Sequence, residues 1–299
     1  MCSLKDLKMD YCSNLSEIPN EIDCLSSLRR LSLCGSNIAT IPVGIKRLVN
    51  LVSLFLSDCK RLQSLLDLPP SLIYLEAIGC PSLTTVSSPR ETISKPECLF
   101  FSYDDLRSFY YDCFTMDLSN CLNLDPNAYE NIMEETRIAV MYCSVEKTLS
   151  KVIVKVPGSE IPKWFPYQSN GPSLTIEWIP PTSSMIQFIL CAVLAVEERK
   201  RVNGLIYIWQ TKIGDYLIKS SPNLFFENGE EGFYEKDHMI ISWYDARLAL
   251  NHNDDVISDS LLPYNSDAYH TFTILFEDQN ETHDIIKVKV VGVNPIILS

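Results

Sequence analysis

The residues that could carry out catalysis or bind a metal are few in this sequence and scattered along it. Asp237 and His238 are adjacent, as an orienting carboxylate and a general base would be, but no nucleophile is evident, and a structural hydrogen bond is the favoured role of His238. The four histidines do not pair with cysteines at zinc-site spacing, and the acidic segment 227–237 lacks a cation-ligand pattern. Phosphate-binding, nucleophile-elbow and zinc-protease motifs are absent as well. We predict no catalytic residues, no metal and no cofactor.

Polar and aromatic residues recur at alternate positions in four similar segments of the first third of the chain. Alternate side chains of a strand point to the same face, so these residues would share one surface. Its mixture of charges, hydroxyls and rings is typical of protein recognition, with Arg30, Phe55 and Tyr74 as candidate anchors; a merely solvated face is the alternative. The predicted protein-binding residues of this concave face are Lys8, Asp10, Arg30, Ser32, Ser53, Phe55, Tyr74 and Glu76.

The element that must position these residues is a repeat. Segments that begin at Leu4, Leu28, Leu51 and Leu72 superpose, with their first leucines 24, 23 and 21 residues apart. One strand per unit would bury the leucines in a shared core that no single unit can form alone. The pattern predicts an α/β leucine-rich-repeat solenoid of about four repeats over residues 1–90. Its two clearest columns are Leu7, Leu31, Leu54 and Leu75, and Cys12, Ser36, Cys59 and Cys80.

The periodicity changes in the rest of the chain. Residues 91–150 form a predicted connector with one helix at about 125–142, where Asp125 is the expected N-cap and Pro126 the first helical residue. From Lys151 onward, apolar residues alternate with a period of two in short segments that turn-forming clusters separate. Many short strands and few helices predict an all-β jelly-roll/Ig-like sandwich of antiparallel strands over residues 151–299.

A proline-rich stretch, "VPGSEIPKWFPYQSNG" at residues 156–171, links two of the predicted strands. Its indole and phenyl rings, Trp164 and Phe165, are large enough to anchor a corner in the core, and Pro162 fixes the approach to them. We favour this structural-anchor role over direct contact with a partner. The polar tip that follows is the better candidate for protein binding, with Tyr167, Gln168 and Asn170 as its predicted residues.

The totals of the 299-residue chain restrict the partners. The net charge of −13 repels phosphate backbones and anionic lipid, so we expect neither nucleic acid nor a membrane surface as a partner. The first residues do not read as a secretory signal, and the 11 cysteines form no CxxC pair. Reduced thiols in the cytoplasm, with the nucleus as the alternative, are therefore the expectation.

Several blocks of the sequence resemble one protein family. After the repeats come "FTMDLSNCLNLDPNA" (114–128), "VPGSEIPKWFPYQSNGPSLTIEW" (156–178), "EKDHMIISWY" (235–244) and "IKVKVVGVNP" (286–295). In this order they resemble the C-terminal part of plant TIR-type nucleotide-binding leucine-rich-repeat disease resistance proteins. The second domain looks like their post-repeat C-JID domain, although this chain has "VVGV" (290–293) where the family motif closes in "CG".

The resemblance implies an intracellular immune sensor whose repeats and C-JID together contact a pathogen effector. The TIR and nucleotide-binding regions of the family are absent from this sequence, so NAD cleavage, nucleotide binding and self-assembly are not expected of it. We predict a non-enzymatic fragment that recognises a protein, either an effector or a receptor subunit, in plant defence. The alternatives are a truncated adaptor or decoy that pairs with a full-length receptor and, less favoured, a jelly-roll enzyme.

Overall fold

The structure is a computed structural model, and it divides the chain into two compact units, Met1–Pro157 and Gly158–Ser299. Each unit is described by itself below. The residues that the structure describes are 4–87, 113–146, 151–178, 185–195, 200–202, 205–213, 216–220, 232–244, 270–278 and 287–298.

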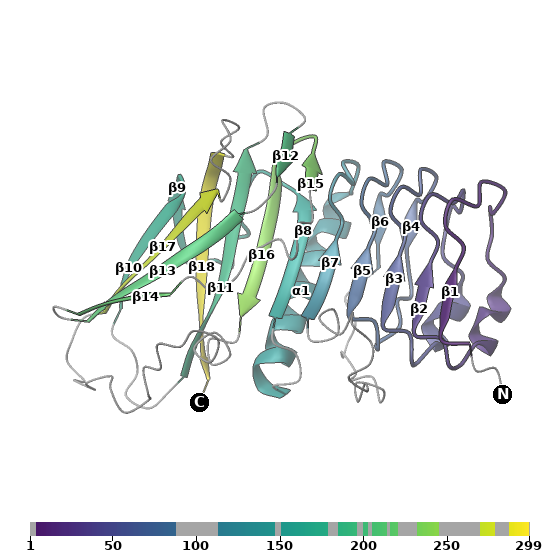
Figure 1. Cartoon of the computed structure of the whole chain (residues 1–299), viewed down its shortest axis with the longest axis horizontal. Coiled ribbons are helices and arrows are strands. Elements are labelled where there is room, and N and C mark those ends of the chain that lie inside the picture. The colour runs from purple at the N-terminus through teal and green to yellow at the C-terminus, as the bar shows by residue number, and fades with distance from the viewer. Residues whose placement is uncertain are drawn as a thin grey trace. The chain divides into compact units, whose positions relative to one another are not determined.

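The first unit is built on short parallel strands that lie side by side (Figure 1). In order across the sheet they are β1 (Asp6–Lys8), β2 (Arg30–Ser32), β3 (Ser53–Phe55), β5 (Tyr74–Glu76), β7 (Cys113–Asp117) and β8 (Lys151–Pro157). Their register aligns the predicted leucine column, which runs Leu7, Leu31, Leu54, Leu75, Met116 and Val154. Leu31 and Leu54 have no exposed surface, so this column forms the core side of the sheet.

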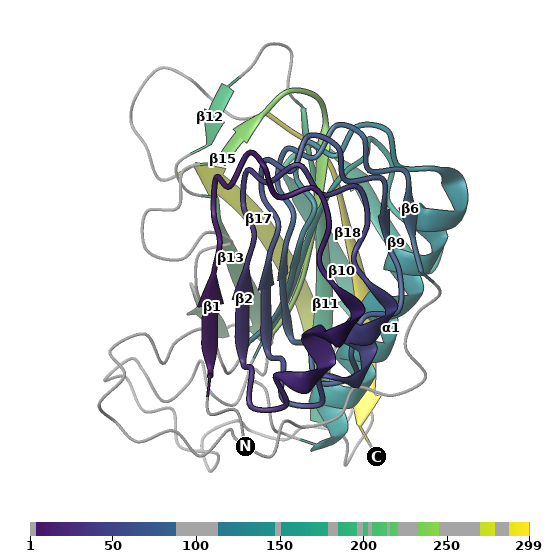
Figure 2. The same ribbon diagram turned by 90° about the vertical axis from the view of Figure 1, so that its right-hand side faces the viewer.

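The return segments of the repeats are short and contain no α-helix. The 3₁₀ helices η1 (Asn20–Cys24) and η2 (Val43–Arg47) follow Pro19 and Pro42 and occupy the side of the unit opposite its strands (Figure 2). Two further strands, β4 (Ser64–Leu65) and β6 (Thr85–Val86), pair with each other in a small parallel sheet. Segments of this length have too few residues for an α-helix to become stable, so a single 3₁₀ turn forms instead.

The turn after the strand has the same backbone conformation in five successive repeats. One residue of each turn lies in the left-handed region of φ, which residues with a Cβ rarely adopt. The five residues and their φ angles are Tyr11 (54°), Gly35 (66°), Asp58 (61°), Gly79 (65°) and Asn120 (60°). The regularity of the fold therefore includes β7 and the turn that follows it.

The helix α1 (Pro126–Glu146) begins where the sequence predicts a cap. The backbone N–H of Ala128 donates to the Asp125 carboxylate at 2.6 Å, which confirms Asp125 as the N-cap. The helix packs on β6 and β8 through buried side chains that include Ile132, Val140 and Cys143. None of the helices that the structure describes is long and apolar enough to cross a membrane.

The second unit consists of longer, antiparallel strands. One group pairs in the order β16 (His238–Tyr244), β11 (Met185–Ala195), β18 (Lys287–Leu298) and β9 (Tyr167–Asn170). Another pairs in the order β10 (Ser173–Trp178), β17 (His270–Asp278), β13 (Leu205–Ile213) and β14 (Tyr216–Ser220). A third sheet joins β12 (Lys200–Val202) to β15 (Gly232–Tyr234).

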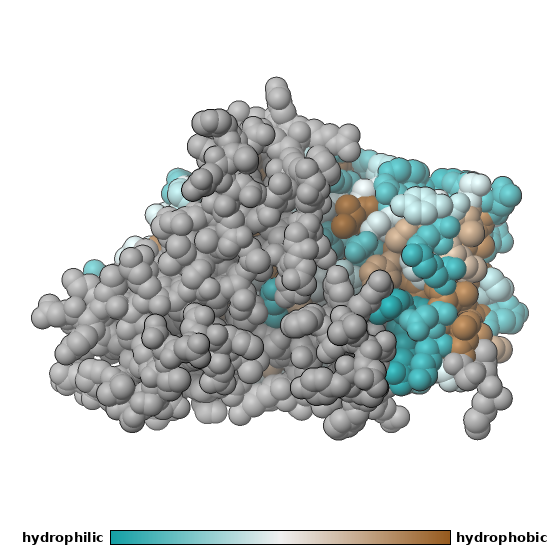
Figure 3. Space-filling model, in the orientation of Figure 1, coloured by the Kyte–Doolittle hydropathy of each residue, from teal (hydrophilic) through white to brown (hydrophobic). Residues whose placement is uncertain are grey.

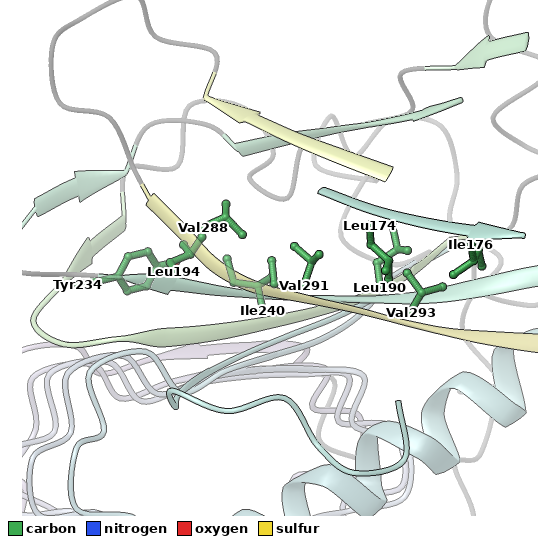
Figure 4. Close-up of a cluster of buried hydrophobic side chains, with 10 residues drawn as sticks. Leu174, Ile176, Leu190, Leu194, Tyr234, Ile240, Val288, Val291 and Val293 are labelled. Carbon is green, nitrogen blue, oxygen red and sulfur yellow. The ribbon is translucent and has the colours of Figure 1, made fainter. Parts of the chain in front are cut away.

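The core of the second unit lies where β10 packs over β11 and β18 (Figure 4). Leu174 and Ile176 of β10 meet Leu190 of β11 and Val291 and Val293 of β18. The register of β11 against β18 shifts between Val193 and Leu194, which marks a β-bulge. Alternation with period two thus produces buried apolar faces here, as it does in any half-buried strand.

The fold class expected from the sequence is wrong. We expected an α/β leucine-rich-repeat solenoid followed by a separate all-β jelly-roll/Ig-like sandwich. The described strands are instead in mixed β-sheet, with parallel pairing in the first unit and antiparallel pairing in the second. In the described part of the chain the α-helix is α1, which comes after the repeats. Leucine columns predict strand register well, but they do not determine what forms between strands or how far a sheet extends.

Candidate functional site

The predicted concave-face residues come together on the first unit's strands, on the side away from the leucine column. We call this surface the strand face; it comprises two rows of residues in adjacent register. One row is Asp6, Arg30, Ser53, Tyr74, Thr115 and Ile153; the other is Lys8, Ser32, Phe55, Glu76, Asp117 and Lys155. The space-filling view shows polar and apolar patches close together over this part of the molecule (Figure 3). A mixed surface of this kind can offer charge, hydrogen bonds and aromatic contacts at once.

Near β1 the strand face is held by a charged network. The Asp10 carboxylate accepts hydrogen bonds from the Ser32 hydroxyl at 2.5 Å and from the Cys34 backbone N–H at 3.1 Å, and Lys8 Nζ lies 3.2 Å from it. Burial acts to raise the pKa of Asp10, but the hydrogen bonds from Ser32 and Lys8 outweigh it, so that the pKa lies below its ordinary value. Asp10 is therefore ionised at neutral pH and fixes the β1–β2 end of the surface.

Aromatic rings occupy the middle of the strand face. The Phe55 and Tyr74 rings are tilted by 38° with centroids 5.2 Å apart. The Tyr74 hydroxyl donates to Glu76 Oε2 at 3.2 Å, and the Ser57 hydroxyl donates to Glu76 Oε1 at 2.7 Å. Tyr74 and Ser53 are buried, whereas Phe55 and Glu76 are half-buried. This arrangement fixes a carboxylate next to two rings.

Sequence reasoning missed that the strand face continues onto β7 and β8. The segment "CFTMDLSNC" (113–121) superposes on "LVSLFLSDC" (51–59), with Met116 in the leucine column and Cys121 in the cysteine column. This signal was present in the sequence, but Cys113 and Met116 replace the expected leucines. Thr115 is therefore a further candidate for the recognition surface, whereas Asp117 and Lys155 beside it are buried.

Asp117 and Lys155 form a buried ion pair. Lys155 Nζ lies 3.1 Å from Asp117 Oδ2, and the two side chains are only 7% and 8% exposed, respectively. The Ser119 hydroxyl and backbone N–H donate to Asp117 Oδ1 at 2.6 and 3.0 Å. Because both oxygens of the carboxylate are hydrogen-bonded, the pair is satisfied where it is buried. It acts as a fixed feature of the fold at this end of the strand face.

The cysteines of the first unit hold the turns together. The thiols of Cys59, Cys80 and Cys121 donate to backbone carbonyl oxygens of the preceding repeat at 3.2, 3.2 and 3.0 Å. Burial raises the pKa of the Cys59 thiol above its ordinary value, and burial followed by the charge of Cys113 raises the pKa of Cys143 to about 12. A protonated thiol is a poor nucleophile, so these residues act in structure.

The residues with catalytic potential do not assemble into a site in the part of the chain that is described. His238 has no exposed surface, and its Nδ1 lies 2.6 Å from the carbonyl oxygen of Lys236. The centroids of the His238 and Tyr234 rings are 4.3 Å apart. This is the predicted structural hydrogen bond. Among the described residues no group of three His, Cys, Asp or Glu side chains could hold a metal ion. Of the acidic segment 227–237, only 232–237 lies within the described residues, and His252 and His283 lie outside them.

The proline-rich corner of the second unit is anchored by its phenylalanine. Phe165 is 2% exposed, and its ring stacks on Trp164 at a centroid distance of 4.1 Å. Trp164 is half-buried, its Nε1 has no hydrogen-bond partner, and its carbonyl accepts from Asn294 Nδ2 at 2.9 Å. Gly292 of β18 lies beneath the corner, where an added Cβ would be 2.9 Å from Ile161 Cγ2.

The predicted loop residues follow this corner on β9. Tyr167, Gln168 and Asn170 are exposed and pair with Val293, Gly292 and Val290 of β18, and the Gln168 side chain donates to the Phe165 carbonyl at 3.0 Å. In the order of its sheet β9 is the last strand. The three residues thus lie on an exposed edge strand, whereas the sequence suggested a loop tip.

The sequence of this chain is similar to a known domain and to several known proteins. Residues 156–293 match the model of the C-JID domain. The Arabidopsis thaliana disease resistance-like protein DSC1 is 30% identical over 277 residues, which is 89% of this chain and 21% of DSC1. The disease resistance proteins RPS4 (26% identical; 91% of this chain, 24% of RPS4) and RML1B (30%; 87% and 20%) of the same plant are also similar.

The C-JID domain and these relatives indicate a receptor region rather than a catalytic domain. The chain belongs with the plant TIR-type nucleotide-binding leucine-rich-repeat disease resistance proteins and corresponds to their C-terminal part, which confirms the family that the sequence blocks indicated. It spans about a fifth to a quarter of the length of the relatives named here.

Proposed function

We propose that this chain recognises a pathogen effector protein as part of a plant immune receptor, without catalysing a reaction. The strand face is the observation that carries the proposal, because its two rows hold charges, hydroxyls and the Phe55–Tyr74 pair within one surface. A few anchors account for most of the affinity in a protein interface, and aromatic and arginine side chains are enriched among them. Arg30, Phe55 and Tyr74 are the anchors that we propose, and Tyr167, Gln168 and Asn170 are a second contact region.

The remaining parts of the proposal concern the type of partner and the cellular compartment. A protein partner fits the net charge of −13 better than nucleic acid or an anionic membrane does. The nine cysteines within the described residues are free thiols, seven of them at least half-buried, which suits the reducing cytoplasm or nucleus.

The test is a binding screen of purified pathogen effectors against the full chain. For any effector that binds, Phe55→Ala and Arg30→Glu are expected to weaken binding at least tenfold, because each removes a proposed anchor. The matched control is Lys46→Glu, since Lys46 is 64% exposed and lies on η2, away from the strands. Unchanged affinity in both strand-face variants would show that the proposed surface is wrong.

A further inference from the structure

We propose that Glu76, together with Phe55, binds the guanidinium group of an arginine side chain that a partner protein presents. The inference rests on the proposed function, since it names the chemistry of the partner at the strand face. It differs from that function in being a statement about one small site, which can be tested with a peptide.

The Glu76 carboxylate is oriented but not saturated. Its Oε1 accepts from the Ser57 hydroxyl at 2.7 Å, and its Oε2 accepts from the Tyr74 hydroxyl at 3.2 Å. Ser57 Oγ in turn accepts from the backbone N–H of Ile78 at 3.2 Å, which leaves the hydroxyl hydrogen for Glu76. Each carboxylate oxygen can accept about two hydrogen bonds, so one acceptor position on each oxygen is left. An acceptor position on each of the two oxygens is what the two parallel N–H groups of arginine require.

Among the described residues, no lysine or arginine forms an ion pair with Glu76. The other carboxylates on the strand face and its rim each have a lysine or arginine within 4 Å, whereas the two hydrogen-bond donors to Glu76 are neutral hydroxyls. The matched pairs are Asp6–Arg30, Asp10–Lys8, Asp58–Lys60 and Asp117–Lys155. A half-buried negative charge attracts a cation more strongly than a fully solvated one does, because the effective dielectric constant is lower. Within the described residues, Glu76 is thus the carboxylate of this face that is left for a cation from outside.

An aromatic ring stands next to the carboxylate. Phe55 is the register partner of Glu76 on the neighbouring strand, and adjacent strands lie about 4.8 Å apart. A guanidinium held by Glu76 therefore comes within reach of the Phe55 ring, which is tilted against Tyr74. Arginine stacks on aromatic rings and makes planar bidentate bonds, whereas lysine offers a compact charge. The site should consequently prefer arginine to lysine.

The experiment is an NMR titration of the full chain with three capped tripeptides, Gly-Arg-Gly, Gly-Lys-Gly and Gly-citrulline-Gly. Citrulline has the shape of arginine without its charge. We expect measurable binding of the arginine peptide, at least threefold weaker binding of the lysine peptide and none of the citrulline peptide. Glu76→Gln should weaken the arginine peptide at least tenfold. Asp58→Asn is the matched control, because Asp58 is exposed and already paired with Lys60 at 2.7 Å, and it should leave the affinity unchanged.

Equal affinity of Glu76→Gln and the wild type for the arginine peptide would overturn the inference, as would equal binding of the arginine and citrulline peptides. If Glu76→Gln does not fold like the wild type by circular dichroism, Phe55→Leu decides instead. A loss of at least threefold supports the site, and an unchanged affinity overturns it. An effector that binds the strand face but is insensitive to Glu76→Gln contradicts this inference alone. Binding of the arginine peptide without any effector found contradicts only the proposed function.

Discussion

The two units of this chain hold their strands together in different ways. In the first unit, strands of three residues pair in parallel with the equivalent strand of the next repeat, as Arg30 does with Ser53. In the second, strands of 11 and 12 residues pair antiparallel across most of the unit's length, as Met185 does with Leu298. Regular local pairing places similar residues in rows and so builds an extended surface. Long-range pairing instead builds a single core with short exposed edges.

The largest effect that this comparison predicts is at the end of the strand face, where its polar groups are buried. Asp117→Ala leaves Lys155 buried without its carboxylate and should destabilise the chain by about 3–5 kcal/mol. Asp58→Ala is the matched change in an exposed pair and should cost less than about 1 kcal/mol. Urea unfolding of both variants measures the difference. Equal costs would mean that the Asp117–Lys155 pair is not buried in solution.

Because the repeats of the first unit are regular, we expect equivalent leucines to differ in their contribution to stability only where their burial differs. Leu54 has no exposed surface, so Leu54→Ala should cost about 2–5 kcal/mol. Leu7 occupies the same column but is half-buried, and Leu7→Ala should therefore cost clearly less. Urea unfolding of the two variants compares them directly. A Leu7→Ala variant as unstable as Leu54→Ala would contradict the difference in burial.

The second unit is expected to be most sensitive to added volume at its corner. Gly292→Ala would place a methyl group 2.9 Å from Ile161 Cγ2 and 3.4 Å from Phe165 Cβ, at a cost of about 1–3 kcal/mol. In an Ile161→Ala background the same change should cost less than half as much, because the obstructing side chain is gone. Thermal unfolding of the double-mutant cycle tests this, and purely additive costs would show that Ile161 is not the obstacle.

The smallest predicted effect concerns pH at the exposed end of the strand face. Because the folded pKa of Asp10 is lowered, its carboxylate stabilises the fold above the unfolded pKa of about 3.9, and this contribution is lost as the pH falls through the folded value. Asp10→Asn should therefore be less stable than the wild type at pH 7, and the difference should shrink as the pH falls below the unfolded pKa of about 3.9. Ser32→Ala removes a donor and should raise the pKa of Asp10, as measured by NMR titration; an unchanged pKa would show that Ser32 does not hold this carboxylate.

Much of the first unit could be predicted because its signals are local. The leucine column fixed the register from Leu7 to Leu75, and the rows of the strand face followed from alternation along each strand. The repeat at 113–121 was missed because Cys113 and Met116 replace the usual leucines there. In the second unit, periodicity indicated strands at 173–178 and 271–276, but it could not indicate which strands pair, since a buried face accepts many partners.

The sequence by itself determined the repeat columns, the cap at Asp125 and the family to which the chain belongs, because each depends on residues close together in the chain. The tertiary structure alone decided that the described strands form mixed β-sheet with the one α-helix α1, rather than an α/β solenoid followed by a sandwich. It also decided that Phe165 is the buried ring of the corner, and that Asp117 is paired with Lys155 while Glu76 has no cationic partner in the part of the chain that the structure describes. These outcomes depend on contacts between residues distant in sequence, and such contacts leave no periodic pattern in the chain.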